Sequence, residues 1–188
     1  MRSNQVIKYR KILSFLISNK GYLGPLHINV DRSIFSSLLG TRNNFIYYDL
    51  QNTITGTKNV FEIIEKMIVH RGRLLIVGGS LNINSILLCL SNIDKSNIAV
   101  IPWCFSSISR MEKFDLLLLQ EVHARSQLEA YNKMRPYIGV NSLTSRDLSY
   151  LINLNLKDPV LLNWYLYLLV FSCRRGFYYR IKNYRNEI

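Results

Sequence analysis

Two segments, GTRNNFIYYDLQNT (residues 40–53) and GRLLIVGG (residues 72–79), decide the fold because they enclose a strand, a helix and a second strand. Residues 44–48 are mostly aromatic or β-branched, which favours a β-strand. Residues 73–77 are apolar after the first position and show no alternation, which is typical of a parallel strand covered on both faces by helices. This unit predicts an α/β protein built on a parallel sheet.

The helix between these strands carries its own start and stop signals. Asn52 or Thr53 can cap its first turn through a side-chain oxygen, and Gly72 ends it. One face is apolar at helical spacing, through Val60, Ile63, Ile64, Met67 and Ile68. We therefore expect this helix to pack its apolar face on the sheet.

The rest of the chain alternates helices and strands in the same way. Helices are predicted at residues 6–18, 81–90, 124–133 and 159–173 and strands at residues 97–103, 115–119, 136–140 and 150–154, whereas residues 21–40 are predicted to form a loop. This alternation predicts right-handed crossovers and a three-layer, mostly parallel, doubly wound sheet flanked by helices. We expect one domain over residues 1–188, with a basic helix at residues 1–20 and a basic, aromatic tail at residues 174–188.

The charge balance is the second strong feature. The chain has 24 Lys and Arg residues against 12 Asp and Glu residues, which gives a formal net charge of +12. Such a balance attracts a polyanion such as RNA, or an acidic membrane surface, and is unusual for a free-standing metabolic enzyme. Apolar residues make up 48% and charged residues 19% of the chain, so a packed core is expected rather than disorder.

Membrane insertion, metal binding and disulfide bonding find little support in the sequence. The longest apolar run, residues 160–173, is shorter than the about 20 residues that a spanning helix needs, although this run and the basic tail leave membrane association as an alternative. The cysteines are far apart in apolar contexts, which predicts reduced, buried thiols; they are Cys89, Cys104 and Cys173. The histidines have no acidic or cysteine partner at metal-ligand spacing; they are His27, His70 and His123. No metal or other cofactor is predicted.

No catalytic constellation emerges from the sequence either. Glu62 and Glu65 lie on a helix that also carries lysines, which is typical of solvated helix charge. Gly78, Gly79 and Ser80 join a strand to a helix, a layout that can bind phosphate, but no complete dinucleotide or P-loop motif surrounds them. The chain is predicted not to be an enzyme. The alternative is a doubly wound enzyme or sensor that binds a phosphorylated small molecule at the Gly78 turn.

Basic residues interleaved with aromatic ones are the remaining signal. They are densest in RRGFYYRIKNYR, residues 174–185, where Arg and Lys can pair with phosphates and Tyr can stack on unpaired bases. A solvated basic tail and a purely structural turn at residues 42–43 are the competing interpretations. The predicted RNA-binding residues are Lys8, Arg10, Lys11, Arg42, Asn43, Arg174, Arg175, Arg180, Lys182 and Arg185.

The two segments quoted first resemble the small-subunit ribosomal protein two family, also called the universal S-two family. That family has a G-x-R-N turn, a strand ending in a D-L-x-x-T helix start and, further along, a G-K-x-L-F-V-G strand. The matching residues here are Gly40, Arg42, Asn43, Asp49, Leu50, Thr53, Gly72, Arg73, Leu75, Ile76, Val77 and Gly78. Looser matches at Trp103, Phe114, Asp115, Glu129, Ala130 and Pro136 extend the likeness over residues 21–171.

Departures from the family pattern resemble those of its mitochondrial members. Tyr22 and Pro25 stand where the family's G-x-H-x-G-H histidines would be. Phe105 and Ser106 replace paired glycines that follow the family's tryptophan. The helical-hairpin insertion of bacterial members is absent, because only residues 104–113 separate the tryptophan block from the next strand.

The resemblance implies a non-enzymatic component of the mitochondrial small ribosomal subunit, located in the matrix. It implies contacts with small-subunit ribosomal RNA and neighbouring ribosomal proteins at the junction of head and body, in support of translation, and no small-molecule substrate. The acid-free N-terminal segment is compatible with a mitochondrial presequence or with a retained helix whose basic face meets RNA.

Overall fold

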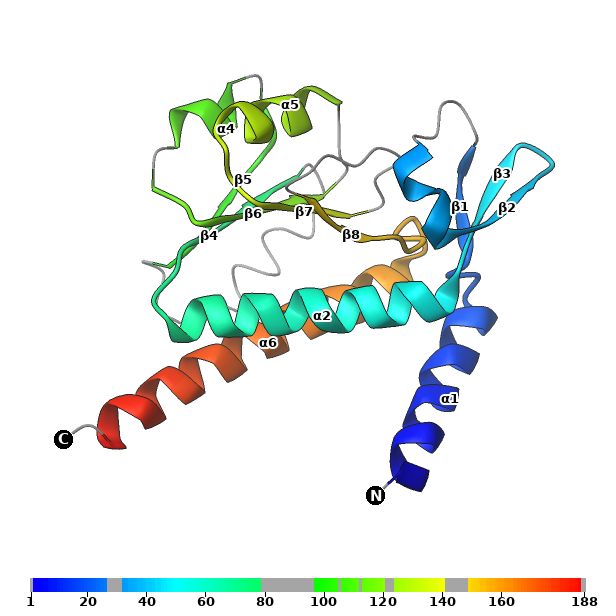
Figure 1. The fold of residues 1–188 in the computed structure, drawn as a ribbon, viewed down its shortest axis with the longest axis horizontal. Coiled ribbons are helices and arrows are strands. Elements are labelled where there is room, and N and C mark those ends of the chain that lie inside the picture. The colour runs from blue at the N-terminus through cyan, green and yellow to red at the C-terminus, as the bar shows by residue number, and fades with distance from the viewer. Residues whose placement is uncertain are drawn as a thin grey trace.

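The computed structural model describes residues 2–26, 32–78, 97–104, 106–111, 113–120, 124–140 and 149–186. Within these ranges lie a five-stranded sheet, a three-stranded sheet and the helices around them (Figure 1). The predicted helix at residues 81–90 lies outside the described part of the chain.

The five-stranded sheet is parallel throughout. Its strands are β4 (Leu74–Val77), β5 (Ile98–Ile101), β6 (Leu116–Gln120), β7 (Tyr137–Val140) and β8 (Ser149–Ile152). They lie in the order β5-β4-β6-β7-β8, so the chain adds strands first on one side of β4 and then on the other. The predicted parallel α/β sheet is confirmed, and this strand order is compatible with a doubly wound fold.

Both faces of the parallel sheet are covered, which explains why its strands are apolar without alternation. Leu74 and Ile76 belong to the core shared with two long helices, whereas Leu75 and Val77 belong to a second core on the other face, with two short helices. Figure 1 shows the long pair on one side of the sheet and the short pair on the other. The long helices are α2 (Leu50–Val69) and α6 (Pro159–Asn186), and the short ones are α4 (Ser107–Arg110) and α5 (Ala124–Asn132).

Helices α2 and α6 pack against each other beneath the sheet. The Phe61 and Tyr165 rings lie 5.9 Å apart, and further along both helices Gly176 lies against α2. A Cβ atom at Gly176 would lie 2.9 Å from the Glu65 carbonyl oxygen and 3.0 Å from the Ile68 Cβ atom. Glycine therefore permits an approach of the two helices that any larger residue would obstruct.

The three-stranded sheet corrects the prediction that residues 21–40 form a loop. It is antiparallel, with the order β1-β3-β2, and a 3-10 helix precedes β2. These elements are β1 (Leu23–Leu26), the 3-10 helix (Arg32–Ser37), β2 (Leu38–Arg42) and β3 (Phe45–Tyr48). The predicted strand at residues 44–48 exists as β3, but it belongs to this sheet and not to the parallel one. Gly24 and Pro25 gave β1 the composition of a loop, whereas its pairing with β3 is set by tertiary contacts.

The start of α2 also differs from the prediction that Asn52 or Thr53 caps it. Asp49 is the N-cap, and its Oδ1 atom accepts a hydrogen bond of 2.9 Å from the Gln51 backbone amide. Thr53 lies inside the helix, where its hydroxyl bridges to the Asp49 and Asn153 carbonyl oxygens at 2.9 Å each. Thr53 thus ties the first turn of α2 to the segment after β8.

The two terminal helices are α1 (Arg2–Ser18) and α6. Helix α1 starts before the predicted residue 6 and ends at Ser18 as predicted, and its Leu16 side chain is buried. Helix α6 continues to Asn186, well past the predicted end near Cys173, so residues 174–186 are helical. Gly176 lies inside α6 without breaking it. In the described part of the chain, no helix has the length and apolar character needed to cross a bilayer.

Candidate nucleic-acid interface

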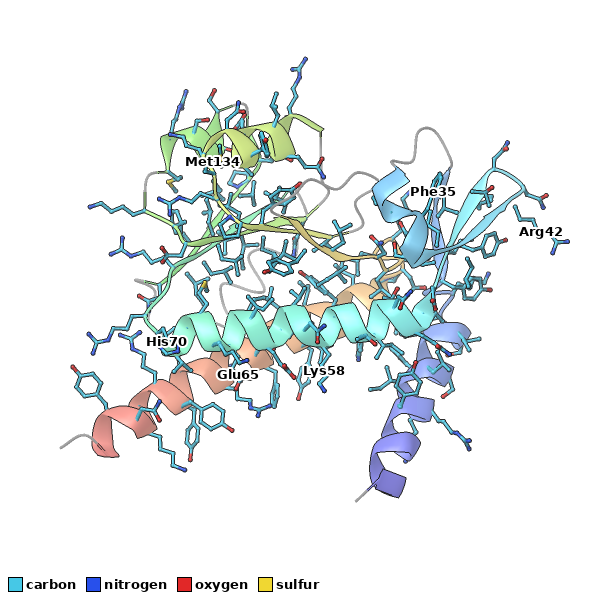
Figure 2. The ribbon with its side chains drawn as sticks, viewed as in Figure 1. Phe35, Arg42, Lys58, Glu65, His70 and Met134 are labelled. Carbon is cyan, nitrogen blue, oxygen red and sulfur yellow. The ribbon has the colours of Figure 1, made fainter. Side chains whose placement is uncertain are left out.

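The structure distributes the predicted RNA-binding residues over three surfaces. Lys8, Arg10 and Lys11 lie on α1, Arg42 and Asn43 lie at the β2–β3 turn, and Arg174, Arg175, Arg180, Lys182 and Arg185 lie on the second half of α6. Figure 2 shows Arg42 at the tip of the hairpin, and Figure 1 shows the C-terminus at the other end of the molecule. The predicted residues therefore do not form one site.

The β2–β3 turn explains the two asparagines by backbone geometry. Asn43 and Asn44 have φ angles of 51° and 63°, and Arg42 pairs with Phe45 across the turn. A two-residue hairpin with positive φ at both central positions is the turn type that favours asparagine. Nothing in this geometry requires an arginine, and the Arg42 side chain is exposed. Arg42 is the residue of this turn that is available to a phosphate.

On α1, the exposed basic side chains have no acidic neighbour along the helix. Arg10 and Lys11 are exposed, and the chain contains no Asp or Glu before Asp31. The structure describes the backbone of Lys8 within α1 and not its side chain. The positive charge of this helix is therefore not neutralised from within α1.

Arg175 on α6 is already engaged inside the protein. Its Nε atom lies 3.3 Å from Glu65 Oε1, and its guanidinium lies over the Tyr179 ring at 5.5 Å from the centroid. The Nη2 atom donates a long hydrogen bond of 3.5 Å to the Tyr179 hydroxyl. The Tyr179 hydroxyl and then the Glu65 charge raise the pKa of Arg175 above its usual range. This arrangement reduces the charge that Arg175 offers to RNA.

The other basic residues of α6 differ in how far they reach solvent. Lys182 is exposed, Arg174 is exposed but also interacts with other residues of the chain, and Arg180 is half-buried. For Arg185 only the backbone is described. Tyr178 is 64% exposed, which leaves a large aromatic face in solvent among these cations.

Arg71 is a basic residue that the sequence reasoning missed. It follows the end of α2 with a φ angle of 61°, and its guanidinium lies 5.0 Å from the centroid of the Tyr184 ring. His70 and Arg73 beside it are exposed. The run R-G-R at residues 71–73 was a usable signal, because it places two cations at the end of a helix. Arg71 links the α2 end to the last turns of α6.

The Gly78 turn has a structural explanation within the described residues. A Cβ atom at Gly78 would lie 2.7 Å from the Gln120 Cβ atom, so β4 and β6 can come together at their carboxyl ends only with glycine at this position. Gln120 is buried, and its side chain interacts with the Tyr165 hydroxyl. Gly79, Ser80 and the helix predicted at residues 81–90, which complete the phosphate-binding layout, lie outside the described part of the chain.

The cysteine prediction is correct for one thiol and wrong for another. Cys173 is buried between α6 and the sheet, and burial raises the pKa of its thiol to about 12. Cys104 is exposed because it follows the end of β5, beyond the covered part of the sheet. Cys89 lies outside the described residues. Among the described residues, no group of three or more His, Cys, Asp or Glu side chains could hold a metal ion.

No protein-family model matches the chain, and no curated protein matches it.

Proposed function

We propose that this protein is a non-enzymatic component of the mitochondrial small ribosomal subunit that binds small-subunit ribosomal RNA and neighbouring ribosomal proteins. The proposal rests on the resemblance to the small-subunit ribosomal protein two family. It includes the position of that family at the junction of head and body and a location in the mitochondrial matrix. It also includes the finer fold expected for a mitochondrial member, a three-layer doubly wound sheet without the bacterial helical hairpin.

The observation that carries the proposal is that residues of the family-like pattern have distinct structural roles. Asn43 forms the turn at positive φ, and Asp49 caps α2. Thr53 ties α2 to the segment after β8. A Cβ atom at Gly72 would lie 2.5 Å from the Met67 Cγ atom. Residues with such roles are the ones that a shared fold would keep, which supports the proposed resemblance.

The distribution of charge also supports an RNA-bound component. The net charge is +12, and exposed cations lie on α1, on the β2–β3 turn and on α6. An enzyme with one anionic ligand would need a single cationic site. Cations on several separate surfaces instead suit a protein that lies among many phosphates.

The short connection between β5 and β6 supports the compact form of the family. Ile101 ends β5 and Leu116 begins β6, and the described residues between them hold only the short helix α4. A long helical hairpin does not fit into this connection. We therefore expect the RNA and protein contacts to come from the body and the two terminal helices.

Sedimentation of mitochondrial lysate through a sucrose gradient tests the proposal. The chain should migrate with the small ribosomal subunit and should leave that fraction when RNase is added or magnesium is withdrawn. A discrete peak near the mass of the free chain, 22.0 kDa, that is unaffected by RNase would overturn the proposal.

A pair of matched variants tests the RNA contacts separately. Changing Arg10, Lys11, Arg42 and Lys182 together to Gln should lower incorporation into the subunit and reduce the salt dependence of RNA binding. The control removes the same charge from the opposite layer, by changing Arg110, Lys113, Lys133 and Arg135 to Gln. Equal loss in both variants would show that only net charge matters and would contradict the assigned residues.

A further inference from the structure

Helix α6 carries a largely exposed stripe whose spacing is that of a helix-packing seam. Successive members lie three and four residues apart in strict alternation, which is the spacing of the a and d positions of a heptad. The stripe spans 18 residues, or about 27 Å of helix. The α6 stripe consists of Trp164, Tyr167, Phe171, Arg174, Tyr178 and Ile181.

Four members of the α6 stripe face away from α2, whereas Trp164 at its start is half-buried and packs near Phe15 of α1. Gly176 marks the side of α6 that touches α2, and at 100° per residue Tyr167, Phe171, Tyr178 and Ile181 lie about 140° to 220° around the helix from it. These four side chains are between 50% and 68% exposed. The Tyr167 and Phe171 rings stack on each other at 6.4 Å. An exposed apolar surface that is continuous over this length is typical of an interaction site.

A groove lies directly beside the α6 stripe and shares two of its residues. It has a volume of about 780 Å³ and lies between α1, α2 and α6. Trp164 and Phe171 line it from α6, Ile12 from α1 and Phe61 from α2. A chain that covers the α6 stripe can therefore insert side chains into this groove along one edge.

Charge decides which occupant fits this surface. Residues 159–186 contain five Lys and Arg residues and no Asp or Glu. The groove wall is internally neutral, because Lys58 pairs with Glu62 and Arg175 pairs with Glu65. Figure 2 shows Lys58 and Glu65 pointing from α2 to the same side. A second copy of this chain would bring two strongly positive helices together, so the complementary partner is acidic.

The pattern favours a protein helix over RNA as the occupant. Nucleotides stack on aromatic rings, but Ile181 and the aliphatic part of the groove lining offer them no such partner; these groove residues are Ile12, Ile54 and Leu168. An apolar stripe with an apolar groove beside it also matches the way in which an amphipathic helix lays its apolar face into a hydrophobic groove.

We propose that the α6 stripe and its neighbouring groove dock one amphipathic α-helix of another protein, with apolar side chains at heptad spacing and acidic residues at its flanks. The partner helix spans about 18 residues, the length that matches the stripe. This inference rests on the geometry of α6 and does not depend on the ribosomal proposal.

Binding of two synthetic peptides to the purified full-length chain tests the inference. The first is a labelled 21-residue helix with Leu at the a and d positions and Glu at the flanking positions, and the second has the same composition with the Leu spacing permuted. Fluorescence anisotropy should show at least about tenfold tighter binding of the first peptide, because only that peptide presents a continuous seam. Equal binding of both peptides would mean attraction by charge alone and would overturn the proposal.

A matched pair of variants locates the binding. Tyr178→Ala with Ile181→Ala should weaken binding of the patterned peptide about tenfold, and both side chains are exposed, so the fold is expected to remain intact. The control pair is Leu39→Ala with Met134→Ala, which removes exposed apolar side chains elsewhere, and Figure 2 shows Met134 in the layer across the sheet from α6. Equal peptide affinity in the two double variants would overturn the proposal.

Two further outcomes would assign the α6 stripe to another occupant. The stripe would be an RNA surface if single-stranded oligouridine bound the natural chain and bound the Tyr178 and Ile181 double variant more weakly, while the patterned peptide bound neither protein. Concentration-dependent dimers of the chain that disappear in the same variant, as seen by sedimentation velocity, would make it a self-association surface. Either result overturns the partner-helix proposal, and neither changes the gradient test of the ribosomal proposal.

Discussion

The Nε atom of Arg175 lies 3.3 Å from Oε1 of Glu65, which joins the second half of α6 to the side of α2. The Glu65 side chain is 19% exposed and the Arg175 side chain is 51% exposed, so the pair lies at the edge of the helix interface. A half-exposed pair of this kind contributes less than about 1 kcal/mol to stability. Its larger effect is on the surface charge, because Glu65 neutralises Arg175, one of the predicted RNA-binding residues.

Arg175→Gln is expected to affect RNA binding less than Lys182→Gln. Lys182 is exposed, and its loss should reduce the slope of log affinity against log salt by about 0.7 for single-stranded RNA. Arg175→Gln should change that slope by clearly less, because Glu65 already neutralises the guanidinium. Salt titrations of both variants with the same RNA provide the measurement. Equal slopes in both variants would show that the Glu65 pair opens when RNA binds.

Gly176→Ala should destabilise the protein by about 1 to 3 kcal/mol, because the added methyl group would lie 2.9 Å from the Glu65 carbonyl oxygen and would push α6 away from α2. The control is Gly56→Ala, also inside a helix, where the nearest atom, the Leu151 carbonyl oxygen, is 3.4 Å away. There the better helix propensity of alanine should leave stability unchanged or raise it by up to about 1 kcal/mol. Urea denaturation of both variants measures the free energy of unfolding. A stabilised Gly176→Ala protein would contradict the close packing of the two helices.

The parallel sheet was predictable because burial on both faces imposes a pattern that needs no knowledge of neighbours. Residues 73–77 and 115–119 are apolar after their first position, and they became the central strands β4 and β6. The antiparallel sheet has no such pattern. In β3, Ile46 and Tyr48 are buried and Phe45 is exposed. All three residues are apolar or aromatic, so the alternation of buried and exposed side chains does not show as an alternation of residue types.

The candidate interface was less predictable than the sheet, because the spacing of charged residues in the sequence does not tell which of them are paired within the fold. Arg175 and Lys182 look alike in the sequence, and only the structure shows that Glu65 neutralises the first. Arg71 was missed because its partner Tyr184 is distant in sequence. The end of α6 was missed because residues 174–188 were interpreted as a basic, aromatic tail that binds RNA, whereas Gly176 and Phe177 continue the buried face of the helix.

Asp49→Ala should lower the free energy of unfolding by about 1 kcal/mol, because the first turn of α2 would lose the acceptor for the Gln51 amide. Asp49→Asn is the matched control, since asparagine caps helices about as well as aspartate. Thermal denaturation should therefore rank the asparagine variant close to the natural chain. Equal loss in both variants would assign the effect to the Asp49 charge rather than to the cap.

Gly78→Ala should destabilise the protein by about 1 to 3 kcal/mol, because the new Cβ atom would lie 2.7 Å from the Gln120 Cβ atom between two strands that are paired in register. The cost should shrink when Gln120 is also changed to Gly, because that change removes the obstructing atom. A double-mutant cycle, measured by urea denaturation, gives this coupling directly. Absence of coupling would show that Gly78 is not held by packing and would reopen the phosphate-binding alternative at this turn.

Cys173 should make the protein less stable at alkaline pH. Burial raises the pKa of this thiol from 9.0 to about 12, so above pH 9 the unfolded chain releases a proton that the folded chain keeps. The stabilisation is fully present below pH 9 and is lost as the pH rises towards 12, by up to about 1.4 kcal/mol per pH unit. Cys173→Ala should therefore show a shallower decline of unfolding free energy between pH 8 and 11, with its cavity cost constant across the range. Cys104→Ala, at an exposed position, should follow the natural chain, and identical slopes for all three proteins would show that the Cys173 thiol is not buried in solution.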